Sequence, residues 1–251
     1  MRRRHGGAPP RVARECGEEL CACVKVSTVH AAPHFASPWK TSAQWSTVAS
    51  ALPIEGRQLL TNAHAVANAR LIHVRRSDGH SRFVASVFAL CFESDLALLR
   101  VLEEAFWEGL RAVAFRVELP RLQEEVTVVG FPDAPCGGDT ICVTKGVVSR
   151  IDLHAYSWES RLLAVQVDGA INPGNSGGPC VDSAGLLVGV AFQKGTASHH
   201  DNIGYIIPTL VVERFLNCAA RNAWGFGALG VRYVRLENTS LRALVAAPHA
   251  S

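Results

Sequence analysis

The feature that most restricts the fold of this chain is a long succession of short apolar segments separated by polar turns. Segments of this length, rich in Val, Ile and Leu and bounded by turn residues, are typical of strands in all-β domains. The expected strands lie at residues 71–74, 83–90, 96–101, 126–131, 140–151, 162–167, 186–192 and 203–207. Residues 103–110 allow one or two helical turns. Residues 208–219 have a helical period and predict a closing helix that presents one apolar face, formed by Val212, Phe215, Leu216 and Ala219.

Three distant segments carry the residue types that an activated serine requires. They read Thr61-Asn-Ala-His64-Ala-Val66, Glu93-Ser-Asp95-Leu-Ala-Leu-Leu99 and Asn172-Pro-Gly-Asn-Ser176-Gly-Gly-Pro179. A serine hydroxyl becomes a good nucleophile only when a base takes its proton, and the base needs a third group that fixes its tautomer. Histidine suits this task because its pKa lies near neutrality. We therefore predict Ser176 as nucleophile, His64 as general base and then acid, and Asp95 as the group that orients the imidazole.

The glycines around Ser176 indicate how the loop could stabilise negative charge. The run Gly174-Asn-Ser-Gly-Gly178 permits a sharp turn and a close backbone approach to a ligand. Amide N–H groups in such a loop can point at one oxyanion, and losing one donor of this kind costs about 2.7–4 kcal/mol. We predict an oxyanion hole in the backbone of Gly174, Asn175 and Ser176, with the amides of Gly174 and Ser176 as donors.

Each signal has a simpler interpretation when it is taken alone. A Gly-Asn-Ser-Gly-Gly run is often a surface turn, a histidine after a strand is usually a satisfied polar residue, and an aspartate before a strand is commonly a turn residue. The three segments are far apart, so the simpler interpretation would have to hold three times independently. The combination therefore favours catalysis.

With these motifs the chain resembles the Deg/HtrA-type serine proteases of the chymotrypsin-fold superfamily. The resemblance covers residues 23–217 and includes Val129-Gly-Phe-Pro132, Thr144-Lys-Gly-Val-Val-Ser-Arg150 and Asn202-Ile-Gly-Tyr-Ile-Ile-Pro208. Phe106-Trp-Glu-Gly-Leu110 and Thr28-Val-His-Ala-Ala-Pro33 are similar to the plant-type Deg branch. The resemblance implies two six-stranded antiparallel β-barrels, at about residues 23–117 and 124–217. The active site would lie in the cleft between them.

The same resemblance implies an activity and an assembly. The activity is that of an ATP-independent serine endopeptidase that hydrolyses unfolded or damaged proteins through an acyl-enzyme, in protein quality control, with no cofactor and no metal. The partners are unfolded polypeptides and further copies of the chain, in a homotrimer or higher homo-oligomer built through N-terminal aromatic side chains. Phe35, Trp39 and Trp45 are the candidates, with ordinary core aromatics as the alternative.

Substrate preference is also implied by the fold family. The residue six positions before the nucleophile lies at the base of the primary specificity pocket, and here that residue is Ala170. Ile171 would adjoin it, and Val190, Ala191 and Phe192 would line the wall. Because no carboxylate lies at the base of the pocket to pair with Lys or Arg, we expect cleavage after small or medium apolar residues.

Two regions depart from the family pattern. Ala49-Ser50-Ala51-Leu52, followed by Pro53, stands where the family usually has Gly-Ser-Gly-Phe, so we expect a distorted strand or a shifted register. This motivates an alternative function, a catalytically latent or inactive Deg-like chaperone or scaffold. Gly225-Phe-Gly-Ala-Leu-Gly230 and Glu237-Asn-Thr-Ser-Leu-Arg242 resemble the opening of a PDZ domain. Residues 218–251 are therefore expected to be a linker and an incomplete PDZ-like start, either because the chain is a fragment or because the module has been lost.

Composition excludes some classes of protein and leaves the compartment open. The formal charge of +3 is too small to indicate nucleic-acid binding, and no apolar run reaches the ~18 residues of a membrane span. The eight cysteines contain no Cys-x-x-Cys pair, which favours free thiols in a reducing intracellular compartment over a thiol- or metal-based module. Residues 1–22 are rich in arginine and lack a secretory apolar region. We expect a disordered extension, with the end of an organelle transit peptide as the alternative, so chloroplast, mitochondrion and nucleus all stay open.

Overall fold

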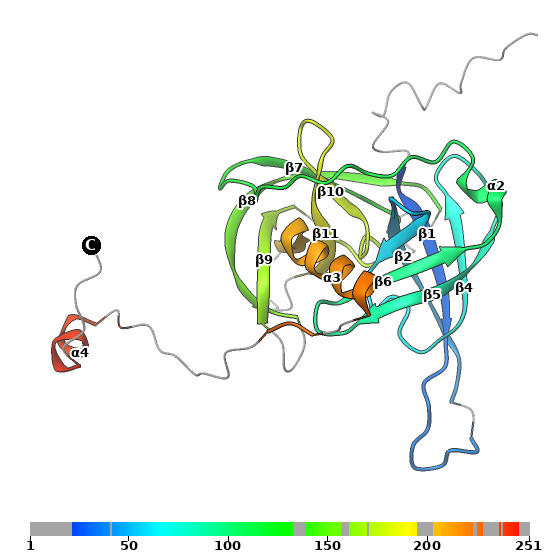
Figure 1. The fold of residues 1–251 in the computed structure, drawn as a ribbon, viewed down its shortest axis with the longest axis horizontal. Coiled ribbons are helices and arrows are strands. Elements are labelled where there is room, and N and C mark those ends of the chain that lie inside the picture. The colour runs from blue at the N-terminus through cyan, green and yellow to red at the C-terminus, as the bar shows by residue number, and fades with distance from the viewer. Residues whose placement is uncertain are drawn as a thin grey trace, which may run out of the picture.

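The computed structural model describes residues 22–40, 42–132, 139–156, 161–169, 171–194, 203–222, 225–227, 236 and 238–245. These residues form two closed barrels of six antiparallel strands each, which lie side by side in Figure 1. The expected all-β class with two six-stranded barrels is confirmed.

The two barrels have the same topology. The first contains β1 (Val24–His30), β2 (Trp45–Ile54), β3 (Gln58–Thr61), β4 (Ala69–Arg76), β5 (Phe83–Cys91) and β6 (Leu96–Val101), followed by the one-turn helix α2 (Glu104–Trp107). The second contains β7 (Glu125–Gly130), β8 (Cys142–Ala155), β9 (Arg161–Asp168), β10 (Pro179–Val181), β11 (Leu187–Lys194) and β12 (Ile203–Pro208). Around the first barrel the order is β1-β2-β3-β6-β5-β4, and the second repeats it as β7-β8-β9-β12-β11-β10.

Strand β6 shows why a continuous apolar run is needed next to the predicted catalytic aspartate. Ala97 and Leu99 belong to the cluster that fills the first barrel. Leu96 and Leu98 point the other way, into a cluster that also contains second-barrel residues such as Leu187. Because successive side chains of a strand face opposite sides, residues 96–99, which are buried on both sides, must all be apolar, whereas Arg100 is exposed.

Strand β2 corrects one expectation. Its pairing with β1 runs from Val24↔Ala51 to His30↔Trp45 without a bulge, and Pro53 is opposite Leu59 of β3. The expected distortion of residues 49–53 is therefore absent. The methyl groups of Ala49 and Ala51 are buried in the first barrel, whose interior has room for them.

Helix α3 (Thr209–Arg221) closes the described body and joins both barrels. It begins one residue later and ends two residues later than expected. Its buried side chains include Val211, Val212, Phe215 and Cys218, whereas Leu216 and Ala219 are only partly buried at the edge of the face. The prediction was therefore correct for Val212 and Phe215. The observed buried face is rotated from the predicted one, so that it includes Val211 and Cys218. Figure 1 shows α3 in orange across the junction of the barrels.

Some expectations fall outside the described residues. This applies to residues 1–21 and to most of residues 228–251, so the disordered extension and the PDZ-like start stay predictions. Within the C-terminal region, α4 (Thr239–Leu244) is capped by Asn238, whose side chain accepts the amides of Ser240 and Leu241. Among the described helices, none has the length and apolarity needed to cross a membrane.

Candidate active site

Asp95 and His64 form a direct pair at the end of the first barrel. The ring Nδ1 of His64 lies 2.7 Å from Asp95 Oδ2, and the His64 backbone N–H donates to Oδ1 at 2.9 Å. A carboxylate can only accept, so Nδ1 carries a hydrogen, and in the neutral ring Nε2 is the acceptor. The His64 side chain is 50% exposed while that of Asp95 is 12% exposed. The pair therefore presents an accepting imidazole nitrogen towards solvent, with its carboxylate behind it.

The loop that carries Asp95 is tied to the histidine segment through the main chain as well. The Asp95 C=O accepts the side-chain amide of Asn62 at 3.0 Å and the Ala63 N–H at 3.1 Å. Asp95 achieves this with a φ of +51°, in the left-handed region that aspartate tolerates better than most residues. Such a conformation persists only where the surroundings impose it, as they do here. The sequence analysis did not identify Asn62 as a residue that holds the Asp95 loop. The available signal was its position two residues before His64.

The loop that carries Ser176 is built from two tight turns. The Asn175 N–H donates to Asn172 O at 3.0 Å, and the Gly178 N–H donates to Asn175 O at 2.9 Å. Gly174 and Gly177 have φ values of +98° and +83°. These are conformations that glycine adopts without steric cost. The loop therefore needs glycine at both positions on either side of Asn175 and Ser176.

This nucleophile loop (residues 172–178) is held between the two barrels. Gly177 N–H donates to Ala191 O in β11 at 2.7 Å, and Ser176 O accepts from Ser50 N–H in β2 at 2.8 Å. A Cβ on Gly177 would lie 2.0 Å from Ser50 O and 2.5 Å from the hydroxyl of Thr61. Thr61 is three residues before the histidine. The packing therefore brings the nucleophile loop against the segment that leads into His64.

One contact of the predicted triad is not formed. Within the described chain, no hydrogen bond joins the Ser176 hydroxyl to the His64 ring, whereas the His64–Asp95 bond is present. Contacts between nucleophile and base are often loose in resting enzymes and tighten in the complex with substrate. The arrangement thus brings together Asp95 and His64 by contact, and Ser176 by the packing of its loop.

The predicted oxyanion donors differ in their availability. The Asn175 amide is used inside the turn with Asn172. Among the described residues, the amides of Gly174 and Ser176 have no hydrogen-bond acceptor. These two amides are therefore the ones that an oxyanion could engage.

The predicted specificity residues are only partly visible. Ala170 lies outside the described residues. Ile171, Val190, Ala191 and Phe192 are described and buried. Ala191 contacts the nucleophile loop through its backbone: its N–H donates to Gly178 O at 3.0 Å, and its C=O accepts from Gly177. Within the described chain, these four side chains pack in the core. Strand β11 contacts the nucleophile loop through its main chain.

A stacked aromatic pair in the second barrel, Tyr156 and Phe192, was not anticipated. Tyr156 stacks on Phe192 with ring centroids 4.6 Å apart, and its hydroxyl donates to Leu163 O at 2.5 Å. Burial raises the pKa of the Tyr156 hydroxyl well above its ordinary value, and the negative charge of Asp95 raises it further. The Tyr156 phenol is therefore neutral. The sequence carried no signal for this contact because residues 156 and 192 are brought together only by the fold.

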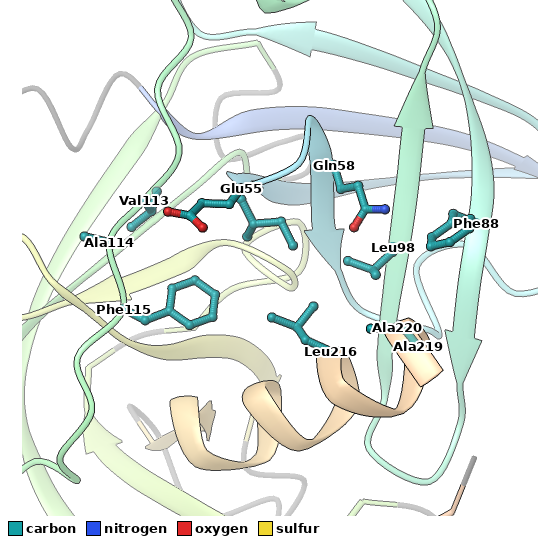
Figure 2. Close-up of a pocket in the computed structure, with 11 residues that line it drawn as sticks. Glu55, Gln58, Phe88, Leu98, Val113, Ala114, Phe115, Leu216, Ala219 and Ala220 are labelled. Carbon is teal, nitrogen blue, oxygen red and sulfur yellow. The ribbon is translucent and has the colours of Figure 1, made fainter. Parts of the chain in front are cut away.

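A separate cavity of about 520 Å³ lies beneath α3, away from the triad residues. Figure 2 shows Phe115 and Leu216 facing it, with Leu98 and Phe88 on the side of the first barrel. Glu55 and Gln58 supply its polar groups. Neither His64, Asp95 nor Ser176 lines this cavity, so it is not the candidate active site.

Comparisons with known proteins agree with this geometry. Residues 49–190, more than half of the chain, match the family described as a trypsin-like peptidase domain. The chain is 45% identical to Protease Do-like 2, chloroplastic, of Arabidopsis thaliana, over 91% of this chain and 38% of that protein. It is 42% identical to Protease Do-like 4, mitochondrial, of the same plant, over 87% of this chain and 42% of that protein. The chain thus spans about two fifths of the length of these relatives.

Solved structures give the same result for the fold. The HtrA-type protease AlgW, solved with a decapeptide, superposes with a TM-score of 0.68 at 26% identity, over 84% of this chain and 68% of that chain. The active form of the Rv3671c protease from M. tuberculosis gives a TM-score of 0.64 at 22% identity, over 79% of this chain and 81% of that chain, which supports the fold alone. The resemblance inferred from the motifs is confirmed: the chain belongs to the trypsin-like peptidase family and is related to the Deg/HtrA-type serine proteases.

Proposed function

We propose that this chain is a serine endopeptidase that uses Ser176, His64 and Asp95. The observation that carries the proposal is the paired hydrogen bonding of Asp95 to His64, which fixes the ring with Nε2 as acceptor. The nucleophile loop packs against the segment that leads into His64. A fixed base beside a glycine-bounded serine is the arrangement that nucleophilic catalysis needs.

The proposed reaction proceeds through an acyl-enzyme. Ser176 Oγ attacks the peptide carbonyl carbon while its proton passes to His64 Nε2. The amides of Gly174 and Ser176 stabilise the oxyanion, and Asp95 stabilises the imidazolium. His64 then gives the proton to the leaving amine, which departs as the C–N bond breaks. A water molecule, activated by the same histidine, hydrolyses the ester and restores the serine.

The proposed substrates are unfolded or damaged polypeptides, degraded without ATP as part of protein quality control. Two comparisons support a peptide substrate. The relatives are called proteases in their names, and the HtrA-type neighbour was solved with a decapeptide. Hydrolysis of a peptide bond requires only water as co-reactant. With Ala170 expected at the base of the pocket, we propose cleavage after small or medium apolar residues. Cleavage-site mapping that found Lys or Arg at this position would contradict the preference.

A homo-oligomer, with a trimer as the first candidate, is part of the proposal. Phe35 is 87% exposed and Trp39 is 82% exposed, in the loop between β1 and β2 that extends from the first barrel in Figure 1. The alternative that they are core aromatics is therefore wrong. Trp45 is also exposed, at 46%, and stacks on His30 with ring centroids 5.1 Å apart. Phe35→Ala combined with Trp39→Ala should lower the mass measured by sedimentation if these rings form the contact.

An organelle is the compartment that the comparisons favour. Several relatives carry chloroplastic or mitochondrial in their names, and none of those named here is nuclear. Among the described cysteines, Cys23, Cys91, Cys142, Cys180 and Cys218 are all free thiols, as a reducing compartment would allow. Fluorescence microscopy of the chain fused at its C-terminus tests this assignment.

A second candidate is a latent or chaperone-like protein of the same fold. The missing hydrogen bond between Ser176 and His64 is the observation that favours it. The two candidates differ in one assay. A latent protein would suppress the aggregation of an unfolded client without producing fragments, and Ser176→Ala would do so equally well.

Digestion of an unfolded casein by the purified chain tests the proposed function. The expected result is fragmentation in the absence of ATP, together with covalent labelling by a fluorophosphonate probe. Ser176→Ala should lose both, while Ser149→Ala should keep both because Ser149 is an exposed residue of β8. Fragments from Ser176→Ala, or an unlabelled and inactive wild type, would overturn the proposal.

A further inference from the structure

Ser50 in β2 makes an unusual set of contacts for a strand residue outside the predicted triad. It is fully buried, at 0% exposure. Its N–H donates to Ser176 O at 2.8 Å, its C=O accepts the Thr61 hydroxyl at 2.7 Å, and its own hydroxyl donates to Gly174 O at 2.8 Å. The same hydroxyl oxygen accepts the Phe131 N–H at 2.8 Å. One residue of the first barrel is thus bonded to the nucleophile loop at two places and to the end of β7.

The direction of these bonds is fixed by the number of protons available. A hydroxyl has one hydrogen to donate and lone pairs to accept with. The Phe131 N–H is a donor and occupies a lone pair, so the Ser50 proton is free for Gly174 O, which can only accept. The Phe131 N–H and the Gly174 C=O therefore cannot exchange their roles towards the Ser50 hydroxyl. The buried Cys23 thiol also lies within hydrogen-bond reach of Ser50, but burial raises its pKa to about 12, so it is not a thiolate that would draw the Ser50 proton from Gly174 O.

The bond to Gly174 acts on the residue whose amide is available for an oxyanion. Gly174 has a φ of +98°, and glycine has little intrinsic preference between such conformations. The Ser50 hydroxyl holds the C=O of Gly174, and the Asn172–Asn175 turn holds the next amide. The Gly174 C=O and the Asn175 N–H belong to one planar peptide unit, which lies between the two units that carry the Gly174 and Ser176 amides, so holding this middle unit limits the rotation of both amides. Without the Ser50 hydroxyl, only the turn would restrain it.

We propose that Ser50 is a positioning residue, whose hydroxyl holds the Gly174 carbonyl so that the Gly174 and Ser176 amides stay aimed at the oxyanion. The inference rests on the proposed function for its catalytic consequence, but the restraint on the loop is a separate physical claim. Ser50 does not touch the substrate. It acts from the first barrel on a loop of the second, so that the relative placement of the barrels is coupled to the oxyanion hole.

The kinetic test is Ser50→Ala in the full chain, with an unfolded casein and a chromogenic peptide as substrates. Losing a whole oxyanion donor costs about 10²–10³ in kcat, and a donor that is present but less well aimed should cost part of that. We expect kcat to fall by roughly 10- to 100-fold with KM within about threefold of wild type. An unchanged kcat would overturn the proposal.

Val74→Ala is the matched control for lost stability. Val74 is fully buried in the interior of the first barrel, on β4, and belongs to the cluster that fills it. Its truncation should lower the urea midpoint of unfolding, and Ser50→Ala should lower it as well because it leaves Gly174 O and the Phe131 N–H without their partner. Both variants are measured at a temperature where circular dichroism shows them folded. Equal losses of kcat in the two variants would mean that Ser50 only stabilises, which would also overturn the proposal.

Hydrogen exchange tests the restraint without requiring activity. In Ser50→Ala, the amides of residues 175, 177 and 178 should exchange at least about tenfold faster than in wild type, while β9 (Arg161–Asp168) stays unchanged. Val74→Ala should show no such selective effect. If the wild type neither cleaves nor labels, the proposed function fails while this measurement still decides the role of Ser50. Unchanged exchange in residues 172–178 would refute it.

Discussion

The carboxylate of Asp95 holds both the main chain and the ring of His64, with one oxygen for each. Oδ1 accepts the His64 backbone N–H at 2.9 Å and Oδ2 accepts Nδ1–H at 2.7 Å. The first bond fixes where the histidine lies, and the second fixes its rotation and tautomer. A carboxylate is required because both oxygens must accept.

Replacing Asp95 by asparagine should separate these two tasks. The asparagine oxygen can still accept one N–H, but its NH₂ group would face Nδ1 and favour the tautomer with hydrogen on Nε2. That tautomer cannot take the serine proton, and the corresponding change in a trypsin-like triad lowers kcat by about 10⁴. We expect a loss of roughly 10³–10⁴ in kcat, measured with a chromogenic peptide. Asp78→Asn, on the surface beside Arg76, is the control and should leave kcat unchanged. More than about a tenth of wild-type activity in Asp95→Asn would refute the assigned role.

Gly177 should be far less replaceable than Gly56, although both have nearly the same backbone angle. Their φ values are +83° and +81°. A Cβ at 177 would lie 2.0 Å from Ser50 O, whereas a Cβ at 56 would meet nothing within 4 Å. Gly56→Ala should therefore lower the free energy of unfolding by about 1 kcal/mol, the cost of placing an alanine at a positive φ. Gly177→Ala should lower it by more than about 3 kcal/mol, because the clash is added to that cost. Urea unfolding measures both. Similar losses in the two variants would show that the close approach of the loop to β2 is wrong.

The sequence was most informative where residues act locally. Residues 96–101 were expected as a buried strand and form β6 with the same bounds, because its first four residues are buried on both faces and must be apolar, while Arg100 is exposed. β10, by contrast, has three residues and follows the glycine loop directly, so no periodic pattern could reveal it.

The sequence was least informative where the site depends on contacts between the barrels. His64 and Asp95 could be named from their local motifs, whereas Ser50 drew notice only as part of an altered strand. Nothing in residues 49–53 indicates a hydroxyl that reaches Gly174, which is 124 positions away. Such contacts arise from the closing of two barrels against each other, and a single sequence contains no periodic signal for them.

The stability of the segment between α2 and β7 (residues 108–124) should depend on the ionisation of Glu124. Arg116 in this segment donates to both oxygens of the Glu124 carboxylate, and the Arg121 N–H donates to Oε2 at 2.8 Å. The hydrogen bond from Arg116, followed by that of the Arg121 amide, lowers the pKa of Glu124 below its ordinary value of 4.5. Because the folded pKa lies below the unfolded one, the stabilisation is present above pH 4.5 and is lost as the pH falls through the folded value.

Glu124→Gln should therefore reduce the acid sensitivity of the protein. The stability of this variant at pH 7 should be lower than that of the wild type, and the two stabilities should converge as the pH falls below 4.5 through the lowered folded pKa. Urea midpoints measured from pH 7 to pH 3 test this. Glu104→Gln is the control, because its ion pair with Arg57 is exposed on both sides and such pairs contribute little. Parallel pH curves for wild type and Glu124→Gln would contradict the prediction.

The described cysteines should differ sharply in their reactivity towards iodoacetamide. Only the thiolate reacts, so both burial and pKa matter. Cys23 and Cys180 are fully buried, and loss of solvation raises the pKa of each thiol well above its ordinary value. Cys142 is half-buried at the start of β8. In the native protein we expect Cys142 to be alkylated at least about 100-fold faster than Cys23 or Cys180.

Mass spectrometry of the digested protein after timed alkylation gives the rate at each site, so the cysteines outside the described residues do not interfere. In urea the three rates should become similar, because the protection comes from the fold. Cys23 lies in the cluster with Val129 and Phe131, where its thiol donates to Val129 O at 3.8 Å. It is therefore protected by the same contact between barrels that holds the nucleophile loop. Rapid alkylation of Cys23 in the folded protein would show that this contact opens, and would count against the rigid junction on which the site depends.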